Sequence, residues 1–87
     1  MFTDYSSTLT LPYPGKRRPV CLSAIIRMEG VGNYTRVHFV NGSQLLVALT
    51  MKRLLERIPE GLFLRLHRKH VVNWRFVSRF GTDATGP

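Results

Sequence analysis

The sequence is poor in acidic residues and in cysteine. Asp and Glu total 5 residues against 13 for Lys and Arg, a formal net charge of +8 over 87 residues. The single cysteine, Cys21, excludes an internal disulfide, and no Cys/His group has the spacing of a zinc site. No apolar run approaches the ~18 residues of a membrane-spanning helix, and no signal peptide is visible at the N-terminus. We therefore expect one small cytoplasmic domain with neither cofactor nor bound metal.

The shortage of carboxylates also argues against catalysis. The 5 acidic residues are scattered along the chain, so no pair has a spacing suited to a general acid and a general base. Gly30 and Gly32 lack the rest of either nucleotide-binding fingerprint. His67 and His70 lie in a segment that is not helical in pattern, and an isolated histidine is more often a structural hydrogen-bonding residue. We expect a binding protein and not an enzyme.

The positive charge is segregated along the chain. No acidic residue occurs between Glu60 and Asp83. That window holds Arg65, Arg68, Lys69, Arg75 and Arg79. Charges that serve solubility usually mix both signs, whereas segregated positive charge favours a polyanionic partner. A nucleic acid is favoured over an anionic membrane, because a membrane is usually bound by a basic amphipathic helix.

The spacing of apolar residues predicts a mainly β domain. Residues 34–40 alternate with period two, so Thr35, Val37 and Phe39 should face the core. Asn41-Gly42 then favours a type I′ hairpin turn, because both positions tolerate positive φ. Further apolar pairs at 71–72 and 76–77 suggest another strand with a bend between them.

One short helix is predicted at about residues 50–58. Thr50 can cap its N-terminus, and from Met51 onward apolar residues recur at i, i+3, i+4 and i+7. Pro59 should end it. The charged face, which includes Lys52, is interpreted as solvated surface and not as a recognition element.

Composition divides the chain into three parts. Residues 1–19 are rich in Ser, Thr and Pro and lack a sustained apolar period. We interpret them as a lead-in segment that is partly ordered at best. Residues 20–80 form the expected domain, and residues 81–87 have the composition of a frayed C-terminal tail.

Two polar segments, 32–36 and 67–70, interrupt the predicted strands. Each carries a cation together with side chains that can donate to a phosphate or to a base edge. Loops held by a rigid sheet could present such groups to a groove. Arg68 and Lys69 are the favoured binding residues. The binding and structural readings remain equally open for the residues of the first segment, Asn33, Thr35 and Arg36, and Tyr34 there could simply pack.

Four stretches in a fixed order resemble one known family. They are IIRMEG at 25–30, GNYTRVH at 32–38, TMKRLLERIP at 50–59 and FLRLHRKHVVN at 63–73. Their order and spacing closely resemble the LytTR DNA-binding domain of bacterial transcription and response regulators. The resemblance covers roughly residues 20–80, and its last stretch is the most specific.

The resemblance implies a fold and a mode of binding. The fold would be an elongated arrangement of small antiparallel sheets with one short helix, and its loops would enter successive major grooves of double-stranded DNA. The first DNA-facing loop would contain Asn33, Tyr34, Thr35 and Arg36, and the second would contain Arg68 and Lys69. His67 and Asn73 match positions that would mainly hold the second loop in shape. Members of the family typically bind paired direct repeats, so a dimer on DNA or a sensor or receiver partner is also expected.

Two other classes of function remain as alternatives. The main one is a basic protein–protein adaptor that docks through an exposed sheet edge. The other is RNA binding, for which the sequence lacks closely spaced exposed aromatic residues that could stack on bases. Sequence-specific binding to duplex DNA is the favoured function.

Overall fold

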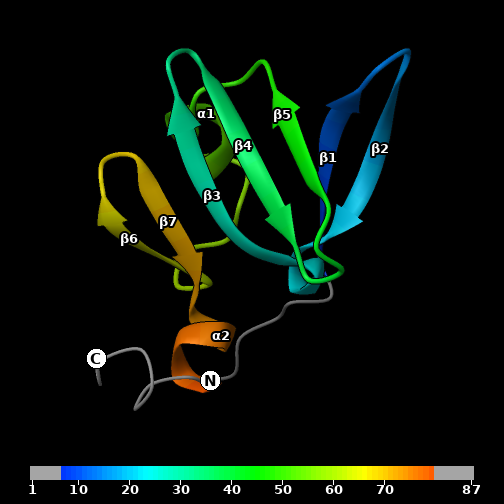
Figure 1. Ribbon diagram of the computed structural model, residues 1–87. Helices are drawn as coiled ribbons and strands as arrows, with labels where there is room; N and C mark the ends of the chain where they lie inside the picture. The colour runs from blue at the N-terminus through cyan, green and yellow to red at the C-terminus, as the bar shows by residue number, and fades with distance from the viewer. Residues whose placement is uncertain (1–6, 80–87) are drawn as a thin grey trace.

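A computed structural model describes residues 7–79, and its centre is a five-stranded antiparallel sheet (Figure 1). The strands lie in the order β5-β4-β3-β7-β6, and each neighbouring pair is antiparallel. Their bounds are β3 Ile25–Val31, β4 Tyr34–Phe39, β5 Gln44–Val47, β6 Phe63–His67 and β7 His70–Asn73. The mainly β fold expected from the sequence is therefore confirmed.

The first strands of the chain form a separate hairpin. β1 (Thr8–Tyr13) pairs with β2 (Lys16–Cys21), and β1 contacts β5. Leu9 and Leu11 from β1 are buried in the core. For residues 7–19 this corrects the interpretation of residues 1–19 as a lead-in that is partly ordered at best, whereas residues 1–6 and the expected C-terminal tail at 81–87 lie outside the described residues. The alternation of two leucines with threonines is too short to predict a strand, and packing against the rest of the domain stabilises it.

Helix α1 (Met51–Leu55) begins as predicted and ends earlier. Thr50 caps it, since its Oγ1 accepts a hydrogen bond of 3.3 Å from the Arg53 backbone N–H. Its apolar stripe faces the core, where Met51 and Leu54 are buried. The next bonds, from Arg57 to Leu54 and from Ile58 to Leu55, span three residues instead of four. Such bonds tighten a last turn, and the following proline cannot continue the helix.

A second helix, α2 (Trp74–Arg79), replaces the strand predicted around residues 76–77. Asn73 Oδ1 accepts a hydrogen bond of 2.8 Å from the Arg75 backbone N–H, as an N-terminal capping residue does. A pair of apolar residues fits a strand and a helix equally well, so periodicity alone could not separate the two. Residues 7–79 thus contain two short α-helices, whereas the sequence predicts one.

The loop between β4 and β5 is a hairpin, as predicted, but with another turn. A type I′ turn needs positive φ at both central residues. Among the described residues the positive φ values all belong to glycines, so Asn41 does not adopt one, while Gly42 has φ 90°. Asn41 Oδ1 instead accepts hydrogen bonds from the backbone N–H and the hydroxyl of Ser43, at 2.9 and 2.6 Å. The connection is the longer loop 40–43.

A single core lies between the five-stranded sheet, α1 and the β1–β2 hairpin. The short 3-10 helix η1 (Leu22–Ala24) links that hairpin to β3. Buried apolar residues come from every layer: Leu9, Leu11, Leu22, Ile25, Met28, Val37, Phe39, Val47, Met51, Leu54, Ile58, Leu62 and Val71.

The molecule is longer than it is wide, with extents of 41 × 29 × 24 Å. In Figure 1 the turns of the β1–β2, β3–β4 and β6–β7 hairpins point away from α2, which lies at the opposite end. Neither helix in residues 7–79 is long and apolar enough to cross a membrane.

Replacing Leu11 by alanine tests whether the first hairpin belongs to the folded core. Leu11 is 0% exposed, so Leu11→Ala should lower the free energy of unfolding by about 2–5 kcal/mol through lost burial and a cavity. Leu46 in β5 is 49% exposed and serves as the control, since Leu46→Ala should change stability by only ~0.5 kcal/mol. Denaturant unfolding followed by circular dichroism measures both. Equal effects of the two substitutions would contradict the packing described here.

Candidate nucleic-acid interface

Two tight turns lie next to each other at one end of the sheet, where the strands reverse direction. The first, Gly32-Asn33, connects β3 to β4, and Gly32 has φ 62°, a value that favours glycine. The second, Arg68-Lys69, connects β6 to β7. The backbone N–H of Gly30 donates a hydrogen bond of 2.8 Å to the carbonyl of Lys69. This bond joins the strand that leads into the first turn directly to the second turn.

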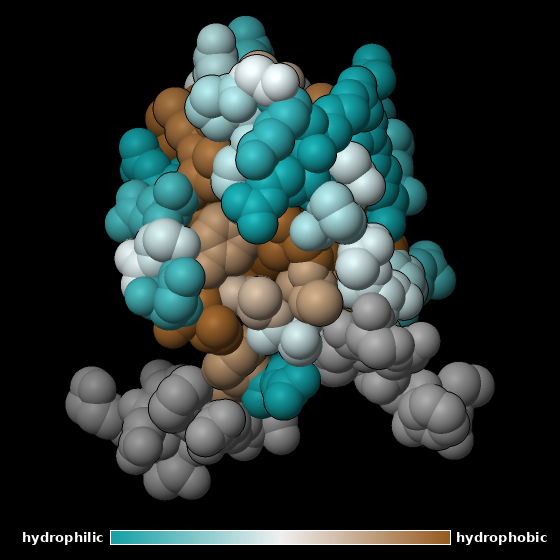
Figure 2. Space-filling model, turned by 90° about the vertical axis from the view of Figure 1, so that its right-hand side faces the viewer, coloured by the Kyte–Doolittle hydropathy of each residue, from teal (hydrophilic) through white to brown (hydrophobic). Residues whose placement is uncertain are grey.

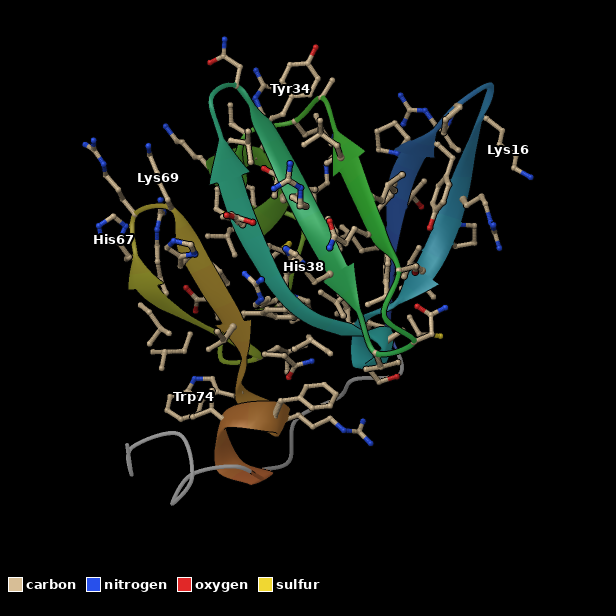
Figure 3. The ribbon with its side chains drawn as sticks, in the orientation of Figure 1. Lys16, Tyr34, His38, His67, Lys69 and Trp74 are labelled. Atoms are coloured by element: carbon tan, nitrogen blue, oxygen red, sulfur yellow. The ribbon has the colours of Figure 1, made fainter. Side chains whose placement is uncertain are left out.

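The backbone of the second turn is held by its neighbours. His67 Nδ1 accepts a hydrogen bond of 3.2 Å from the Lys69 backbone N–H. Arg65 Nη2 donates one of 2.5 Å to the Arg68 carbonyl. A bulge between Arg65 and His67 breaks the alternation of β6 just before the turn and changes the direction of the strand there. Arg68 and Lys69 are both exposed, and Figure 3 shows Lys69 at the tip of the β6–β7 hairpin.

A groove of about 310 Å³ runs between the two turns and the start of α1. We call it the basic groove. Its lining residues are Gly30, Gly32, Tyr34, Thr50, Met51, Lys52, Arg65, Arg68 and Lys69. They include four cations and no acidic residue. Two of the acidic residues of the chain, Glu56 and Glu60, follow the other end of α1, and Glu60 lines a different hollow.

Lys52 and Arg65 were not among the site residues expected from the sequence. Lys52 had been interpreted as part of a solvated helix face, yet it lines the same groove as Lys69. Arg65 pairs across the strands with the buried Val71 and therefore lies on the face of the sheet that α1 covers. Helical periodicity showed that Lys52 lies outside the apolar stripe. Helical periodicity could not show that the charged face of the helix would lie across a groove from the Arg68-Lys69 turn.

Thr35 does not present its side chain at the surface. It is 0% exposed, and its Oγ1 donates a hydrogen bond of 2.7 Å to the carbonyl of Leu49. That bond holds the segment that leads into the N-terminal cap of α1. Thr35 therefore shapes the wall of the basic groove from inside, which corrects its placement on a DNA-facing surface. The neighbouring Tyr34, 47% exposed, lines the groove itself, and Asn33 is exposed in the turn.

Asn73 is also completely buried. Its Nδ2 donates hydrogen bonds to the carbonyls of Leu22 and Ile25, at 3.3 and 2.8 Å, while its Oδ1 caps α2. These bonds connect β7 to the entry of β3 and to α2, at a distance along the strand from the Arg68-Lys69 turn. The side chain thus joins β7 to β3 and to α2 at the end of the sheet away from the turns, and none of these bonds reaches the second turn.

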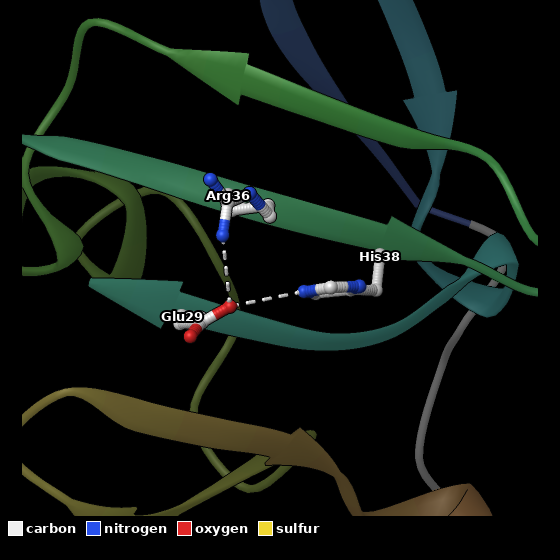
Figure 4. A network of polar contacts seen from close by, with 3 residues as sticks. All are labelled: Glu29, Arg36 and His38. Atoms are coloured by element: carbon white, nitrogen blue, oxygen red, sulfur yellow. Dashed lines mark hydrogen bonds and ion pairs between the residues drawn. The ribbon is translucent and has the colours of Figure 1, made fainter. Parts of the chain in front are cut away.

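Arg36 belongs to a polar network on the other face of the sheet. Glu29 Oε1 lies 3.5 Å from Arg36 Nη1 and 3.3 Å from His38 Nε2 (Figure 4). The hydrogen bond from His38, more than the positive charge of Arg36, holds the pKa of the Glu29 carboxyl below its usual value. Arg36 is therefore held by a carboxylate outside the basic groove. Within residues 7–79, no group of three His, Cys, Asp or Glu side chains could hold a metal ion.

A small β domain in which two neighbouring turns and the start of a helix enclose a groove lined by four cations has the charge distribution of the class of nucleic-acid-binding domains. The family model of the LytTr DNA-binding domain matches residues 15–86. Because the match covers most of the chain, the protein belongs to the LytTr DNA-binding domain family, and it is a DNA-binding domain. The resemblance identified from the sequence is confirmed.

One solved structure shares the fold. It is named as the LytTr DNA-binding domain of a methyl-accepting/DNA response regulator from Bacillus cereus, with a TM-score of 0.64 and 23% sequence identity. The similarity covers 79% of this chain and 62% of that one, so this chain spans less than two thirds of its length. No curated protein sequence matches the chain.

Substituting His38 tests the network on the outer face. His38→Ala removes the main cause of the lowered pKa of Glu29, so this pKa should rise toward its ordinary value of 4.5. In the wild type, the paired carboxylate contributes stability above that ordinary pKa and loses it as pH falls through the lowered folded value. NMR titration of the Glu29 side-chain carboxyl measures the shift. Arg36→Ala, the control, should raise the pKa less, and an unchanged pKa in His38→Ala would contradict the assigned cause.

Proposed function

We propose that this domain binds double-stranded DNA in a sequence-specific manner as part of a transcription regulator, with the two turns of the basic groove inserted into the major groove. The observation that carries the proposal is the convergence of both turns and four cations on one groove without an acidic residue. The major groove of B-DNA admits a two-stranded β-ribbon, and a hairpin turn is the end of such a ribbon.

The residues of the groove take different parts in the proposed complex. Arg68 is the candidate for base recognition, because a guanidinium can hold guanine O6 and N7 with two hydrogen bonds. Asn33, exposed in the first turn, has the side chain that reads adenine. Lys52, Arg65 and Lys69 are suited to phosphates, which fix the register of a protein on the duplex without reading its sequence.

The remaining expected site residues act through the scaffold. His67 holds the backbone of the second turn, and Thr35 supports one wall of the groove from the interior. Asn73 fixes the pairing of β7 with β3 at the far end of the same strands. Tyr34 offers an exposed ring beside the first turn, and Arg36 flanks it from the outer face. We further propose that a site consists of paired direct repeats, which requires two copies of the domain on DNA or a sensor or receiver partner. Such a regulator acts in the cytoplasm, where bacterial DNA is found.

The second candidate function is a basic adaptor that docks through a sheet edge. β6 is an outer strand of the five-stranded sheet, and Leu66 near its end is 62% exposed. Outer strands offer unpaired backbone groups to a partner strand. The adaptor does not account for the four cations of the basic groove, which is why we favour DNA.

The salt dependence of binding separates the two functions. If Lys52, Arg65 and Lys69 each neutralise a phosphate, log Kd should vary with log salt concentration with a slope of at least ~2.7 in magnitude, at about 0.9 for each phosphate. Fluorescence anisotropy with a duplex recovered by selection from random DNA measures it. Absence of duplex binding at low salt, together with salt-independent binding of a protein, would favour the adaptor and reject DNA binding.

Arg68→Ala tests the proposed base contact. If Arg68 reads a base, its loss should weaken binding to the selected duplex by about 1–3 kcal/mol, roughly 5- to 150-fold, and relax the preference at one base pair. Lys69→Ala is the matched control in the same turn and should weaken all sequences alike. A second selection with each variant measures the preference. A uniform loss in Arg68→Ala would reassign Arg68 to phosphate, and unchanged affinity would remove it from the site.

A further inference from the structure

The β1–β2 hairpin carries a group of cations that the basic groove does not include. Lys16, Arg17 and Arg18 directly follow the Pro14-Gly15 turn, and each is exposed. Proline followed by a glycine with φ 77° is the combination that a type II turn requires. The tip of this hairpin is therefore a tight turn with defined geometry that presents three consecutive basic residues.

The hairpin is fixed to the body of the domain. Its two strands pair without a register shift, from Thr8 opposite Cys21 at the base to Tyr13 opposite Lys16 at the turn. Leu9 and Leu11 insert into the core, and the Leu22 backbone N–H donates a 3.1 Å hydrogen bond to the Ser7 carbonyl at its base. A cation on such a support loses little conformational freedom of the backbone when it binds, so it contributes more to affinity than one on a loose arm.

The hairpin borders the same segment that forms one wall of the basic groove. Arg17 lines a hollow of about 230 Å³ together with Pro12, Ala48, Leu49 and Arg57. The carbonyl of Leu49 accepts the hydrogen bond from Thr35, and Thr50 and Lys52 then enter the groove. Residues 48–52 thus line the hollow of Arg17 at their beginning and the basic groove at their end. In Figure 3, Lys16 and Tyr34 lie at the same end of the molecule, opposite Trp74.

Among the described residues, the hollow beside this hairpin is lined by cations without a carboxylate. Two arginines, Arg17 and Arg57, line one hollow whose other lining residues are uncharged. Figure 2, which views the molecule from the side of this hairpin, shows hydrophilic residues gathered over its upper part. Cations placed together repel each other and lower stability, and a bound polyanion offsets that cost. Arg18 is engaged differently, since its guanidinium lies 5.1 Å from the centre of the Tyr13 ring.

We infer that the β1–β2 hairpin makes a third contact with duplex DNA, in which Lys16 and Arg17 bind backbone phosphates next to the basic groove. The inference rests on the proposed DNA binding and extends it to a surface that neither recognition turn covers. We assign the contact to phosphate because Lys16 and Arg17 lie on a strand beside the groove and outside the two turns proposed to enter the major groove, and a phosphate contact requires only positive charge. It widens the footprint without changing the preferred sequence.

The test compares Lys16→Ala/Arg17→Ala with wild type on a duplex recovered by selection and on a shuffled duplex. If two phosphate contacts are lost, the salt slope should fall in magnitude by about 1.8, at ~0.9 per phosphate. Affinity should fall by the same factor on both duplexes, so that their ratio is unchanged. With the double variant, ethylation of phosphates at one edge of the footprint should no longer interfere with binding, while interference elsewhere stays as in wild type. Thermal unfolding of each variant checks that the hairpin remains folded.

Two further variants control for charge. Arg75→Ala removes one positive charge from α2, at the opposite end of the domain (Figure 1), and should leave the footprint intact. The matched variant Arg17→Ala removes one charge from the hairpin and should weaken binding and lower the salt slope by about 0.9. Arg17→Lys keeps the charge and should retain most of the affinity and of the salt slope, because the contact with phosphate is electrostatic.

The outcomes separate this inference from the proposed function. Wild-type protein that ignores duplex DNA at low salt would reject both. If wild type binds and Arg68→Ala weakens it, while Lys16→Ala/Arg17→Ala keeps the wild-type footprint and salt slope, only the third contact is wrong. A change in the ratio between selected and shuffled duplexes for the hairpin variant would also overturn it, since it would mean a base contact.

Discussion

The pairing of β3 with β7 is the interaction on which the rest of the site depends. Residues 25–47 supply one half of the sheet and residues 63–73 supply the other, and the ladder from Arg27 to Glu29 joins them. The hydrogen bond from Gly30 to Lys69 extends this junction to the second turn. Without it, the Gly32-Asn33 turn and the cationic Arg68-Lys69 turn would belong to separate hairpins with no defined distance between them. The basic groove therefore exists only because a long-range strand pairing forms.

Charge and stability oppose each other in this domain. Four cations line the basic groove, and Arg17 and Arg57 share the neighbouring hollow. At this end of the molecule no acidic residue lines either hollow, whereas Glu29 neutralises a cation on the outer face of the sheet. The core opposes this repulsion: within residues 7–79 the buried residues are apolar except for Thr35 and Asn73, each of which has hydrogen-bonding partners. A polyanionic ligand would relieve it.

The turns are short and their backbones are already held in place. His67 and Arg65 satisfy backbone groups of the second turn, and Thr35 fixes the segment that leads to Lys52. Ordering these segments therefore costs little at the moment of binding, which leaves more of the electrostatic attraction for affinity. The buried side chain of Thr35 thus positions an exposed cation through the backbone, although it does not itself reach the surface.

The sequence by itself determined the local features. Period-two alternation placed Thr35, Val37 and Phe39 toward the core, and the apolar stripe with its Thr50 cap defined the start of α1, because these patterns depend only on neighbouring residues. The excess of positive charge and the matched stretches also indicated DNA as the partner.

Only the tertiary structure decided which cations act together. Lys52 reaches the groove of Lys69 because α1 packs against β3, and the first hairpin is ordered because Leu9 and Leu11 find core partners far along the chain. Likewise Asn73 starts α2 and binds the entry of β3 across 48 and 51 positions. These contacts join residues distant in sequence, and no local pattern of hydrophobicity or charge contains that information.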